Sequence, residues 1–433
     1  MTRNAREVDV LIVGGGPAGL AAGAELAAAG VGRVEILERE QEAGGIPRHC
    51  HHGGFGGRLD RSAYAWASAN GTAYVRASVS GSAYVPGSVS GPAYARRSVA
   101  AARDAGAALR TGVTVTGWAG PRTVETTGPS GLERITARAV VLATGARERP
   151  RSARLIPGTR PPGVYTTGEL QQAVHLYGQR IGTRAVVVGN EPVGHAAAAT
   201  LRAAGVQVVA MVTDRPASPV RPRSRRTPLL TGTTVTALTG RSRLSGVALR
   251  HDDGRTTTLR CDTVVLTGDF VPDHELARRG GLVLDPGTRG PAYDAAFRTS
   301  RPGVFAAGNL LHAVERAGIA AQEGRAVAVP VLHRLAGTEE PPGGGRRLVV
   351  DAPLRWIAPN VTGPDGARPQ GDRFVLRTAR RLTRPLLVVS QGGRRLHSQR
   401  LLLPAVPGRP FHLAADWTDR VDPHGAPVRI TAR

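Results

Sequence analysis

The chain opens with a strand-length apolar run that leads directly into a glycine-rich turn. Residues 9–13 read Asp-Val-Leu-Ile-Val, the glycines follow, and an alanine-rich stretch with a helical pattern occupies residues 20–29. A second apolar run at residues 34–37 ends in Glu38. This order of strand, turn, helix and strand predicts a βαβ unit of an α/β fold with a parallel sheet.

Three later apolar runs also have the length of buried strands and end in turns that contain glycine. They occupy residues 139–143, 184–188 and 303–307, and helical patterns follow two of them, at His195–Ala204 and Leu310–Ala328. Strands that alternate with helices in this way indicate a doubly wound arrangement. We therefore expect an α/β protein with two Rossmann-like dinucleotide-binding domains.

The pattern changes after the proline and glycine residues at 341–345, which are typical of a linker. Beyond them, short runs of alternating apolar and polar residues are separated by glycine and proline turns, which predicts a small β-rich domain. We expect this domain to mediate self-association or a contact with a partner. The runs are Arg347–Val350, Phe374–Arg377, Leu386–Val389 and His397–Leu402.

The first glycine-rich turn has the residues and the context of a dinucleotide site. Gly14 permits a tight turn, Gly16 lets the backbone approach a pyrophosphate, and Gly19 lets the helix pack closely on the strand. A phosphate is then stabilised by the positive end of the helix. Glu38 ends the second strand, 24 positions after Gly14, where a carboxylate accepts hydrogen bonds from ribose hydroxyls.

A second turn, from Gly189 to Gly194, repeats this pattern without its middle glycine. Glu191 stands where the backbone would touch the pyrophosphate, and its charge repels a phosphate. The next strand ends at Thr213 or Asp214, so the residue that would face the ribose is ambiguous. NAD(P) binding and a retained fold that has lost its nucleotide both remain open.

The three segments together resemble flavoproteins with two dinucleotide-binding domains, the superfamily of the pyridine nucleotide-disulfide oxidoreductases. The resemblance covers residues 8–335 and implies FAD as the cofactor. In that family the last motif ends in Gly-Asp, and the aspartate bonds the ribityl chain; here the residue is Asn309, whose amide still forms hydrogen bonds. The resemblance adds Gly45, Thr144, Gly145, Gly308 and Asn309 to the expected cofactor-binding residues.

The same resemblance predicts an FAD domain that is split around an NAD(P)-binding-like domain. The expected boundaries are 1–150 for the first part of the FAD domain, with a repeat insertion at 58–90, then 151–268 for the second nucleotide domain, 269–337 for the second part of the FAD domain, 338–345 for the linker and 346–433 for the β-rich domain.

A narrower resemblance rests on Gly44-Gly45-Ile46, Cys50, the segment His52-Gly-Gly-Phe-Gly56 and the segment Gly91-Pro-Ala-Tyr-Ala95. These are similar to flavoproteins associated with anaerobic glycerol-3-phosphate oxidation and to the FAD-binding subunits of opine oxidase and hydrogen cyanide synthase. Position 53 is glycine where that pattern has asparagine. Two cysteines exclude an iron–sulfur cluster held by four thiolates.

The resemblance implies hydride transfer from a small hydroxyl or amine substrate to FAD, with NAD(P) or another electron acceptor. The helix after Asn309 is expected to point at the flavin, so His312 is the first candidate base and His52 the second. Cys50 is a candidate thiolate, although a packing role is the alternative. A partner-dependent FAD-binding subunit of a heteromeric complex is the competing interpretation.

Four ten-residue units, starting at 61, 71, 81 and 91, share Ala-Tyr at their third and fourth positions. Their alternating pattern is consistent with hairpins, but they carry too little apolar bulk for a core of their own. We interpret them as a tolerated tandem duplication, with a lid over the flavin as the alternative.

The amino-acid composition limits the classes of binding partner that we expect. The net charge of +24 comes from 57 basic residues, all of them arginine, but these are scattered, and the run Arg221–Arg226 lacks aromatic residues for base stacking, so we expect no nucleic-acid partner. No apolar stretch spans a bilayer, and no metal site is predicted. We expect a cytoplasmic protein that acts on a small molecule, either as a homo-oligomer or with a redox partner subunit.

Overall fold

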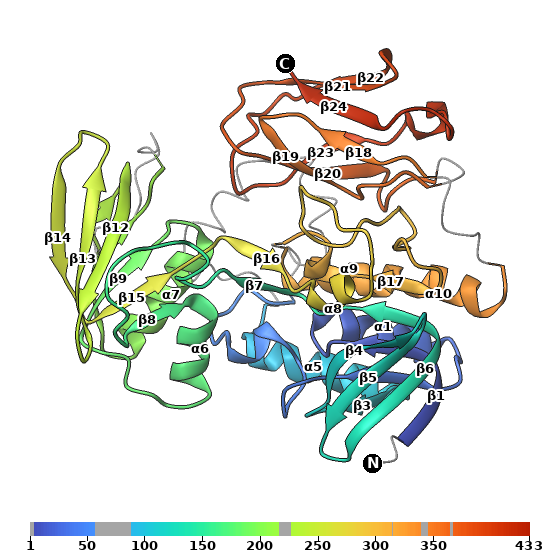
Figure 1. Cartoon of the computed structure of the whole chain (residues 1–433), viewed down its shortest axis with the longest axis horizontal. Coiled ribbons are helices and arrows are strands. Elements are labelled where there is room, and N and C mark those ends of the chain that lie inside the picture. The colour runs from blue at the N-terminus through green and yellow to red at the C-terminus, as the bar shows by residue number, and fades with distance from the viewer. Residues whose placement is uncertain (1–3, 57–87, 216–226, 314, 339–344, 364–366) are drawn as a thin grey trace.

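The computed structural model describes residues 4–56, 88–215, 227–313, 315–338, 345–363 and 367–433. Most of the ten-residue repeat and the arginine-rich run at 221–226 lie outside the described residues. The described chain forms two parallel-sheet domains and a C-terminal β domain (Figure 1), which confirms the predicted α/β fold with a β-rich C-terminal region.

The first domain is built on a seven-stranded sheet, of which five strands are parallel and lie in the order β3-β2-β1-β6-β17. The strands β4 and β5 extend it as an antiparallel meander on the long strand β6. The strands are β1 (Asn4–Val13), β2 (Val34–Leu37), β3 (Ala108–Arg110), β4 (Thr114–Gly120), β5 (Thr123–Gly128), β6 (Gly131–Leu142) and β17 (Val304–Ala306).

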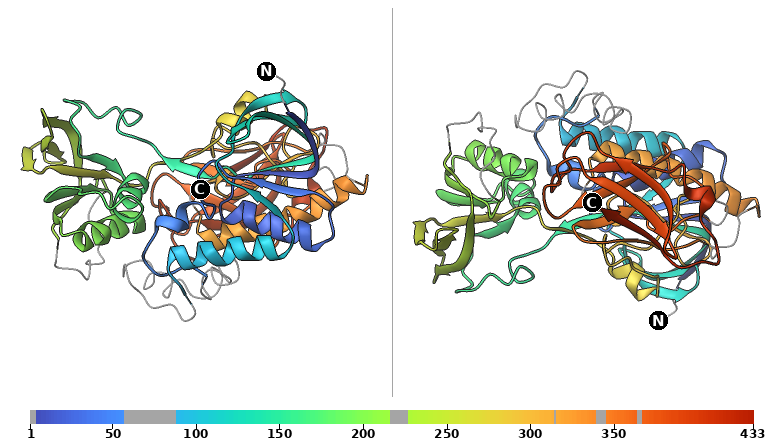
Figure 2. Two further views of the ribbon diagram at one scale, coloured as in Figure 1. Left: turned by 90° about the horizontal axis from the view of Figure 1, so that it is seen from below. Right: turned by 90° about the horizontal axis from the view of Figure 1, so that it is seen from above.

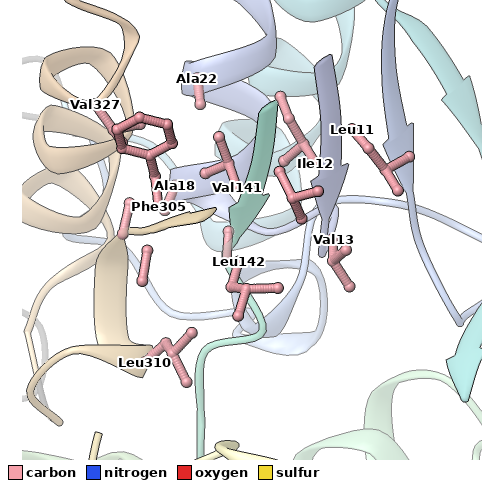
Figure 3. Close-up of a cluster of buried hydrophobic side chains, with 14 of the residues drawn as sticks. Leu11, Ile12, Val13, Ala18, Ala22, Val141, Leu142, Phe305, Leu310 and Val327 are labelled. Atoms are coloured by element: carbon pink, nitrogen blue, oxygen red, sulfur yellow. The ribbon is translucent and has the colours of Figure 1, made fainter. Parts of the chain in front are cut away.

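Helices lie along one side of this sheet, as Figure 2 shows. They are α1 (Pro17–Ala28), α5 (Gly91–Asp104), α9 (Ala317–Ala326) and α10 (Ala328–Leu335). Figure 3 shows the core between them, where Ile12 and Leu142 of neighbouring strands and Phe305 of β17 are fully buried. Removing this apolar surface from water stabilises the domain by about 25 cal/mol for each Å² buried.

Helix α9 begins later than the pattern at Leu310–Ala328 predicted. A short 3-10 turn, η2 (Gly308–Leu310), follows β17, and α9 starts only at Ala317. The side chain of Asn309 hydrogen-bonds the backbone N–H and C=O of Glu315, which closes a loop in place of a helical turn. A polar side chain that competes for backbone hydrogen bonds in this way disfavours helix.

The last repeat unit is a helix and not a hairpin strand. Residues 91–100 form most of α5, with Pro92 in its first turn. Proline at this position is favourable because the missing N–H has no partner inside the helix. The prediction of hairpins for the other units lies outside the described residues.

The second domain contains a five-stranded parallel sheet in the order β11-β10-β9-β15-β8, and a separate three-stranded meander is inserted in the chain between β11 and β15. Its strands are β8 (Val164–Thr166), β9 (Arg184–Val188), β10 (Gln207–Val212), β11 (Leu229–Leu230), β15 (Thr263–Leu266), and the meander β12 (Thr233–Gly240), β13 (Leu244–His251) and β14 (Thr256–Arg260). Its helices are α6 (Thr167–His175) and α7 (Pro192–Ala203).

Two antiparallel strands, β7 (Ala146–Glu148) and β16 (Phe270–Pro272), carry the chain into and out of the second domain. They run between the two domains in Figure 1, so the second domain is inserted into the first.

The C-terminal domain consists of two sheets with the orders β18-β24-β21-β22 and β19-β20-β23. Phe374 and Trp417 stack in the core between them. The strands are β18 (Leu348–Val350), β19 (Leu354–Ala358), β20 (Arg373–Thr378), β21 (Leu386–Gln391), β22 (Arg394–Arg400), β23 (Phe411–Ala414) and β24 (Val428–Ala432). Trp356, Ala358 and Val375 of this domain belong to the core cluster of the first domain, so the two domains share a packed interface.

Candidate functional site

Three segments that are far apart in sequence meet at the carboxyl ends of the parallel strands β1, β6 and β17. They are the turn after Val13, the turn after Leu142 and the turn after Ala306. Ligands of open α/β sheets bind at this edge, where strand connections diverge to opposite sides. The parallel register therefore builds one candidate site from all three predicted cofactor motifs.

The three glycines of the first motif have distinct steric environments. Gly14 has a φ of +113°, and a Cβ there would lie 2.4 Å from the carbonyl oxygen of Ala143. A Cβ on Gly19 would lie 1.9 Å from the carbonyl oxygen of Gly14, so the helix can pack against the turn only without a side chain. A Cβ on Gly16 would lie 3.9 Å from the Cα of Gly45, which is an ordinary van der Waals contact, so a methyl group fits at Gly16 without a clash.

Glu38 lies behind this turn and is buried. Its Oε2 accepts a hydrogen bond of 2.9 Å from the backbone N–H of Gly15, and its Oε1 accepts one of 2.9 Å from the backbone N–H of Glu40. A carboxylate oxygen accepts more than one hydrogen bond, so each oxygen keeps capacity for a hydroxyl. Glu38 thus fixes the turn and remains suited to a ribose.

The second glycine pair closes the opposite side of the cradle. Gly45 has a φ of +60°, and a Cβ there would lie 2.9 Å from the Cα of Gly16. The backbone N–H of Gly44 donates to the carbonyl oxygen of Gly15 at 2.8 Å. The two turns therefore lie directly against each other, with glycine backbone facing glycine backbone.

Thr144 and Gly145 follow β6 with different surroundings. The Thr144 hydroxyl donates to the carbonyl oxygen of Asp273 at 2.7 Å, which ties the turn to the returning chain. Gly145 has a φ of +76°, and a Cβ there would meet no atom within 4 Å. Of this pair, Gly145 is the residue next to open space.

Gly308 and Asn309 lie close to the first motif. A Cβ on Gly308 would lie 2.7 Å from the Cβ of Ala18, and the Gly308 N–H donates to Glu323 Oε2 at 3.0 Å. Both ends of the Asn309 amide hydrogen-bond Glu315 backbone, with Oδ1 accepting at 2.9 Å and Nδ2 donating at 3.2 Å. Asn309 therefore shapes the loop before α9.

His312 is buried and does not stand at the start of α9, where the sequence pattern placed it. Its Nε2 lies 2.9 Å from Glu323 Oε1, and its ring lies 5.6 Å from that of Trp356. Burial disfavours the imidazolium, but the Glu323 carboxylate outweighs burial and raises the pKa of His312. Its Nδ1 has no hydrogen-bond partner among the described residues.

Cys50 does not have the properties of a reactive thiolate. Its side chain is buried, and Sγ donates to Gln171 Oε1 at 3.1 Å. Burial, with a smaller contribution from Glu148, raises the pKa of the Cys50 thiol to about 12. Of the two interpretations of Cys50, the packing role fits this geometry better than the thiolate does.

The three histidines around Cys50 have separate environments. His52 is exposed, and its Nδ1 lies 2.9 Å from the carbonyl oxygen of Gly53. His51 stacks on His175 of α6, with ring centroids 4.0 Å apart. His49 is 2% exposed, and neither of its ring nitrogens has a hydrogen-bond partner among the described residues. Burial lowers the pKa of His49 to about 4, so the ring is neutral at pH 7.

The second glycine turn is filled by a side chain of the protein. Glu191 Oε1 accepts a hydrogen bond of 2.5 Å from the Thr267 hydroxyl, and Oε2 accepts one of 3.0 Å from the Asn190 N–H. Glu191 Oε1 also lies 2.5 Å from the positions that a Cβ would take on Gly189 and on Gly268. Gly194 packs against Gly189, because a Cβ on Gly194 would lie 2.9 Å from the Gly189 carbonyl oxygen.

The first turn fits an FAD pyrophosphate and the second does not offer the same space. The first turn presents glycine backbone and the amino end of α1, whereas the Glu191 carboxylate occupies the second turn. Helix ends with free N–H groups bind anions, and a fixed negative charge opposes a second one.

Two residues near the site were missed by the sequence analysis. Glu323 binds both Gly308 and His312, and Gln171 binds Cys50. An acid within the alanine-rich helix α9 is the one signal in the sequence that could have singled out Glu323.

Within the described ranges, no group of three or more histidine, cysteine or acidic side chains is arranged to hold a metal ion. In the same part of the chain, no helix has both the length and the apolar character that crossing a bilayer requires.

Comparison with known proteins gives the chain relatives among the components of oxidases. It is 28% identical to the alpha subunit of the sarcosine oxidase of Corynebacterium sp. (strain P-1), over 82% of this chain and 36% of that protein. It is 32% identical to an opine oxidase subunit of Agrobacterium tumefaciens (strain Ach5), over 49% of this chain and 38% of that protein. The chain thus spans little more than a third of the length of these relatives.

The fold is similar to that of a solved thioredoxin reductase from T. acidophilum, with a TM-score of 0.58 and 21% identity over 77% of this chain and 99% of that one. The model of the pyridine nucleotide-disulphide oxidoreductase family matches residues 8–324. The expected resemblance to this superfamily and to opine oxidase is confirmed, while the link to glycerol-3-phosphate oxidation and hydrogen cyanide synthase stays a prediction. Since the family model matches most of its residues, the chain belongs to the pyridine nucleotide-disulphide oxidoreductase family, a family of oxidoreductases.

Proposed function

We propose that this chain binds FAD at the carboxyl edge of the first sheet and takes part in the oxidation of a small amine together with a partner subunit. The observation that carries the proposal is the glycine cradle. A Cβ would meet no atom within 4 Å at Gly145 and none nearer than 3.9 Å at Gly16, while Gly14 and Gly19 have no room for a side chain. A turn in which some glycines are tightly packed and others leave the backbone accessible is suited to a ligand that approaches the backbone.

Each part of the cradle has a role in holding the cofactor. The amino end of α1, from Gly16 onward, would bind the pyrophosphate through backbone N–H groups, since the N–H groups of Gly14 and Gly15 donate to Leu37 and Glu38. Glu38 would accept hydrogen bonds from the ribose, and Gly308 and Asn309 would lie along the ribityl chain. When bound, FAD supplies an acceptor for the hydride from the substrate carbon, which carries the two electrons of the oxidation.

An amine is favoured over a hydroxyl compound as the substrate. The relatives described above are named as components of a sarcosine oxidase and an opine oxidase. A neutral amine must lose hydride from carbon, and a basic side chain assists by holding the nitrogen in its unprotonated form. His52 is the exposed member of the three catalytic candidates and is the one able to meet a substrate.

The surroundings of the other two catalytic candidates, Cys50 and His312, support the requirement for a partner subunit. Cys50 holds its proton, and His312 is enclosed between Glu323 and Trp356. The relatives described above are also named as subunits. A stand-alone dehydrogenase with His52 as its base is the second candidate.

NAD(P) is a weaker proposal for the electron acceptor. The carboxylate of Glu191 lies in the second glycine turn and would have to leave before a pyrophosphate could enter. We therefore propose that electrons leave FAD for an acceptor other than a nucleotide bound at Gly189–Gly194.

Anaerobic titration of the purified, FAD-loaded chain with sarcosine separates the two candidates. For a partner-dependent subunit, the visible flavin spectrum stays oxidised with sarcosine but bleaches fully with dithionite, which shows that the flavin is accessible. Rapid bleaching by sarcosine or another secondary amine, with loss of the effect in His52→Gln, would instead establish the stand-alone dehydrogenase. The Gln variant of the exposed His424 is the matched control.

A further inference from the structure

The C-terminal β domain contacts the loop that carries the third cofactor motif. We infer that Arg377 and Trp356 of this domain are positioning residues, which hold Gly308 and Asn309 in the arrangement that FAD requires. The inference rests on the proposed binding of FAD to the first sheet. It gives the C-terminal domain a role in cofactor retention, for which the domain's own sequence carries no motif.

The first step is the closure between Asn309 and Glu315. The Asn309 amide hydrogen-bonds the Glu315 backbone at both of its ends, with distances of 2.9 and 3.2 Å. Whatever fixes Glu315 therefore also fixes the side chain of Asn309, since the amide has little freedom while both hydrogen bonds hold.

The second step is the ion pair that fixes Glu315. Arg377 of β20 donates to Glu315 Oε1 at 3.0 Å, and the two side chains are only 12% and 8% exposed. Removing one member of a buried pair leaves the other charge without compensation, which disturbs a structure far more than loss of an exposed pair. A neutral residue at position 377 would leave the buried Glu315 carboxylate with only the more distant Nδ1 of His312, 3.9 Å from its Oε1, and would drive it toward water.

The third step is the contact on the other side of the loop. Trp356 of β19 lies 5.6 Å from His312, ring centre to ring centre, and the Arg377 guanidinium lies 5.7 Å from the Trp356 ring. His312 binds Glu323, and the other oxygen of Glu323 accepts the hydrogen bond from the Gly308 N–H. Two connected routes thus run from the C-terminal domain, one to Asn309 and one to Gly308.

The two routes end on neighbouring residues of one motif. A shift of the loop by less than about 1 Å would misplace both groups, because hydrogen bonds weaken steeply when their distance or angle departs from the optimum. We therefore expect the loss of Arg377 to weaken FAD binding while both sheets of the C-terminal domain stay folded.

The test compares Arg377→Gln with the wild-type chain and with Arg381→Gln, which removes an exposed arginine of the same domain. We expect R377Q to bind FAD at least about tenfold more weakly, as measured by equilibrium titration of flavin fluorescence, and R381Q to bind as the wild type does. Arg377→Lys should recover part of the affinity. The double variant E315Q/R377Q should bind more tightly than R377Q, because it removes the unpaired carboxylate.

Hydrogen exchange of the apo proteins gives a readout that needs no cofactor. R377Q should raise exchange in the peptide that contains Gly308 and Glu315, with R381Q unchanged. Wild-type-like FAD affinity and exchange in R377Q would overturn the inference. Failure of the wild-type chain and R381Q to bind FAD would overturn the proposed function instead, and exchange would still decide whether Arg377 holds the loop.

Discussion

At the scale of single residues, the cradle depends on where side chains are absent. Gly14 and Gly19 have backbone carbonyl oxygens within 2.4 and 1.9 Å of the position that a Cβ would take, whereas Gly16 has nothing nearer than 3.9 Å. Gly16 also has an ordinary φ of −84°. The same mutation to alanine should therefore affect the stability of the fold at position 14 and the binding of the cofactor at position 16.

We predict that Gly16→Ala leaves the free energy of unfolding within about 0.5 kcal/mol of the wild type but weakens FAD binding by about tenfold or more. The new methyl group lies where the pyrophosphate would approach. Gly14→Ala should destabilise the apo protein by more than about 2 kcal/mol, because both its φ and its contact with Ala143 are unfavourable. Urea unfolding of the apo proteins, with flavin titration of G16A, measures both effects.

His49 is a buried histidine that should make the stability of the chain depend on pH. Its pKa is about 4 in the folded chain and about 6.5 when exposed. Below pH 6.5 the unfolded chain binds a proton that the folded chain does not bind. The contribution of His49 to the free energy of unfolding is therefore fully present above about pH 6.5 and is lost as the pH falls toward 4.

Replacing His49 with phenylalanine should reduce the loss of stability between pH 7 and pH 4. The difference of about 2.5 pKa units corresponds to an upper value of about 3 kcal/mol. Urea unfolding of the apo wild type, H49F and the exposed-site control His424→Gln at both pH values tests this. Equal pH dependence in H49F and the wild type would mean that His49 is not buried as a neutral ring.

At the scale of secondary-structure elements, the two glycine turns precede similar helices but present different groups to a ligand. Helix α1 begins behind an open turn, whereas α7 begins at Pro192 behind the carboxylate of Glu191. The Glu191 carboxylate engages Asn190 and Thr267 within the second turn itself, whereas the Glu38 carboxylate that engages Gly15 in the first turn comes from the end of β2.

We predict that Glu191→Gly increases the affinity of the second turn for NADH or NADPH by about tenfold or more, because it removes both the charge and the occupying group. Isothermal titration of the wild type, E191G and the isosteric E191Q separates these two contributions. Tight binding by the wild type, unchanged in E191G, would show that the carboxylate does not obstruct the turn.

At the scale of the whole molecule, local motifs predicted the fold well because each combines an apolar run with a glycine turn. The strands that precede Gly14, Gly145 and Gly308 have their carboxyl ends at the same edge of the sheet, as the family resemblance implied. The start of α9 was misplaced because the Asn309–Glu315 closure competes with helix over a few residues. The amino-acid composition of this segment does not indicate the Asn309–Glu315 closure.

The candidate catalytic residues were the least predictable part of the site. Their chemistry depends on burial and on partners from distant segments, such as Gln171 for Cys50, Glu323 for His312 and Trp356 from the C-terminal domain. Sequence spacing contains no information about these pairings. The glycine positions were easier, because backbone geometry alone restricts them.

The stoichiometry of FAD in the purified chain tests the central claim most directly. After reconstitution with excess FAD and removal of free cofactor, the visible absorption spectrum should show an oxidised flavin at one FAD per chain, and G16A treated in the same way should retain much less. A folded wild-type chain that stays colourless after this treatment would contradict the account.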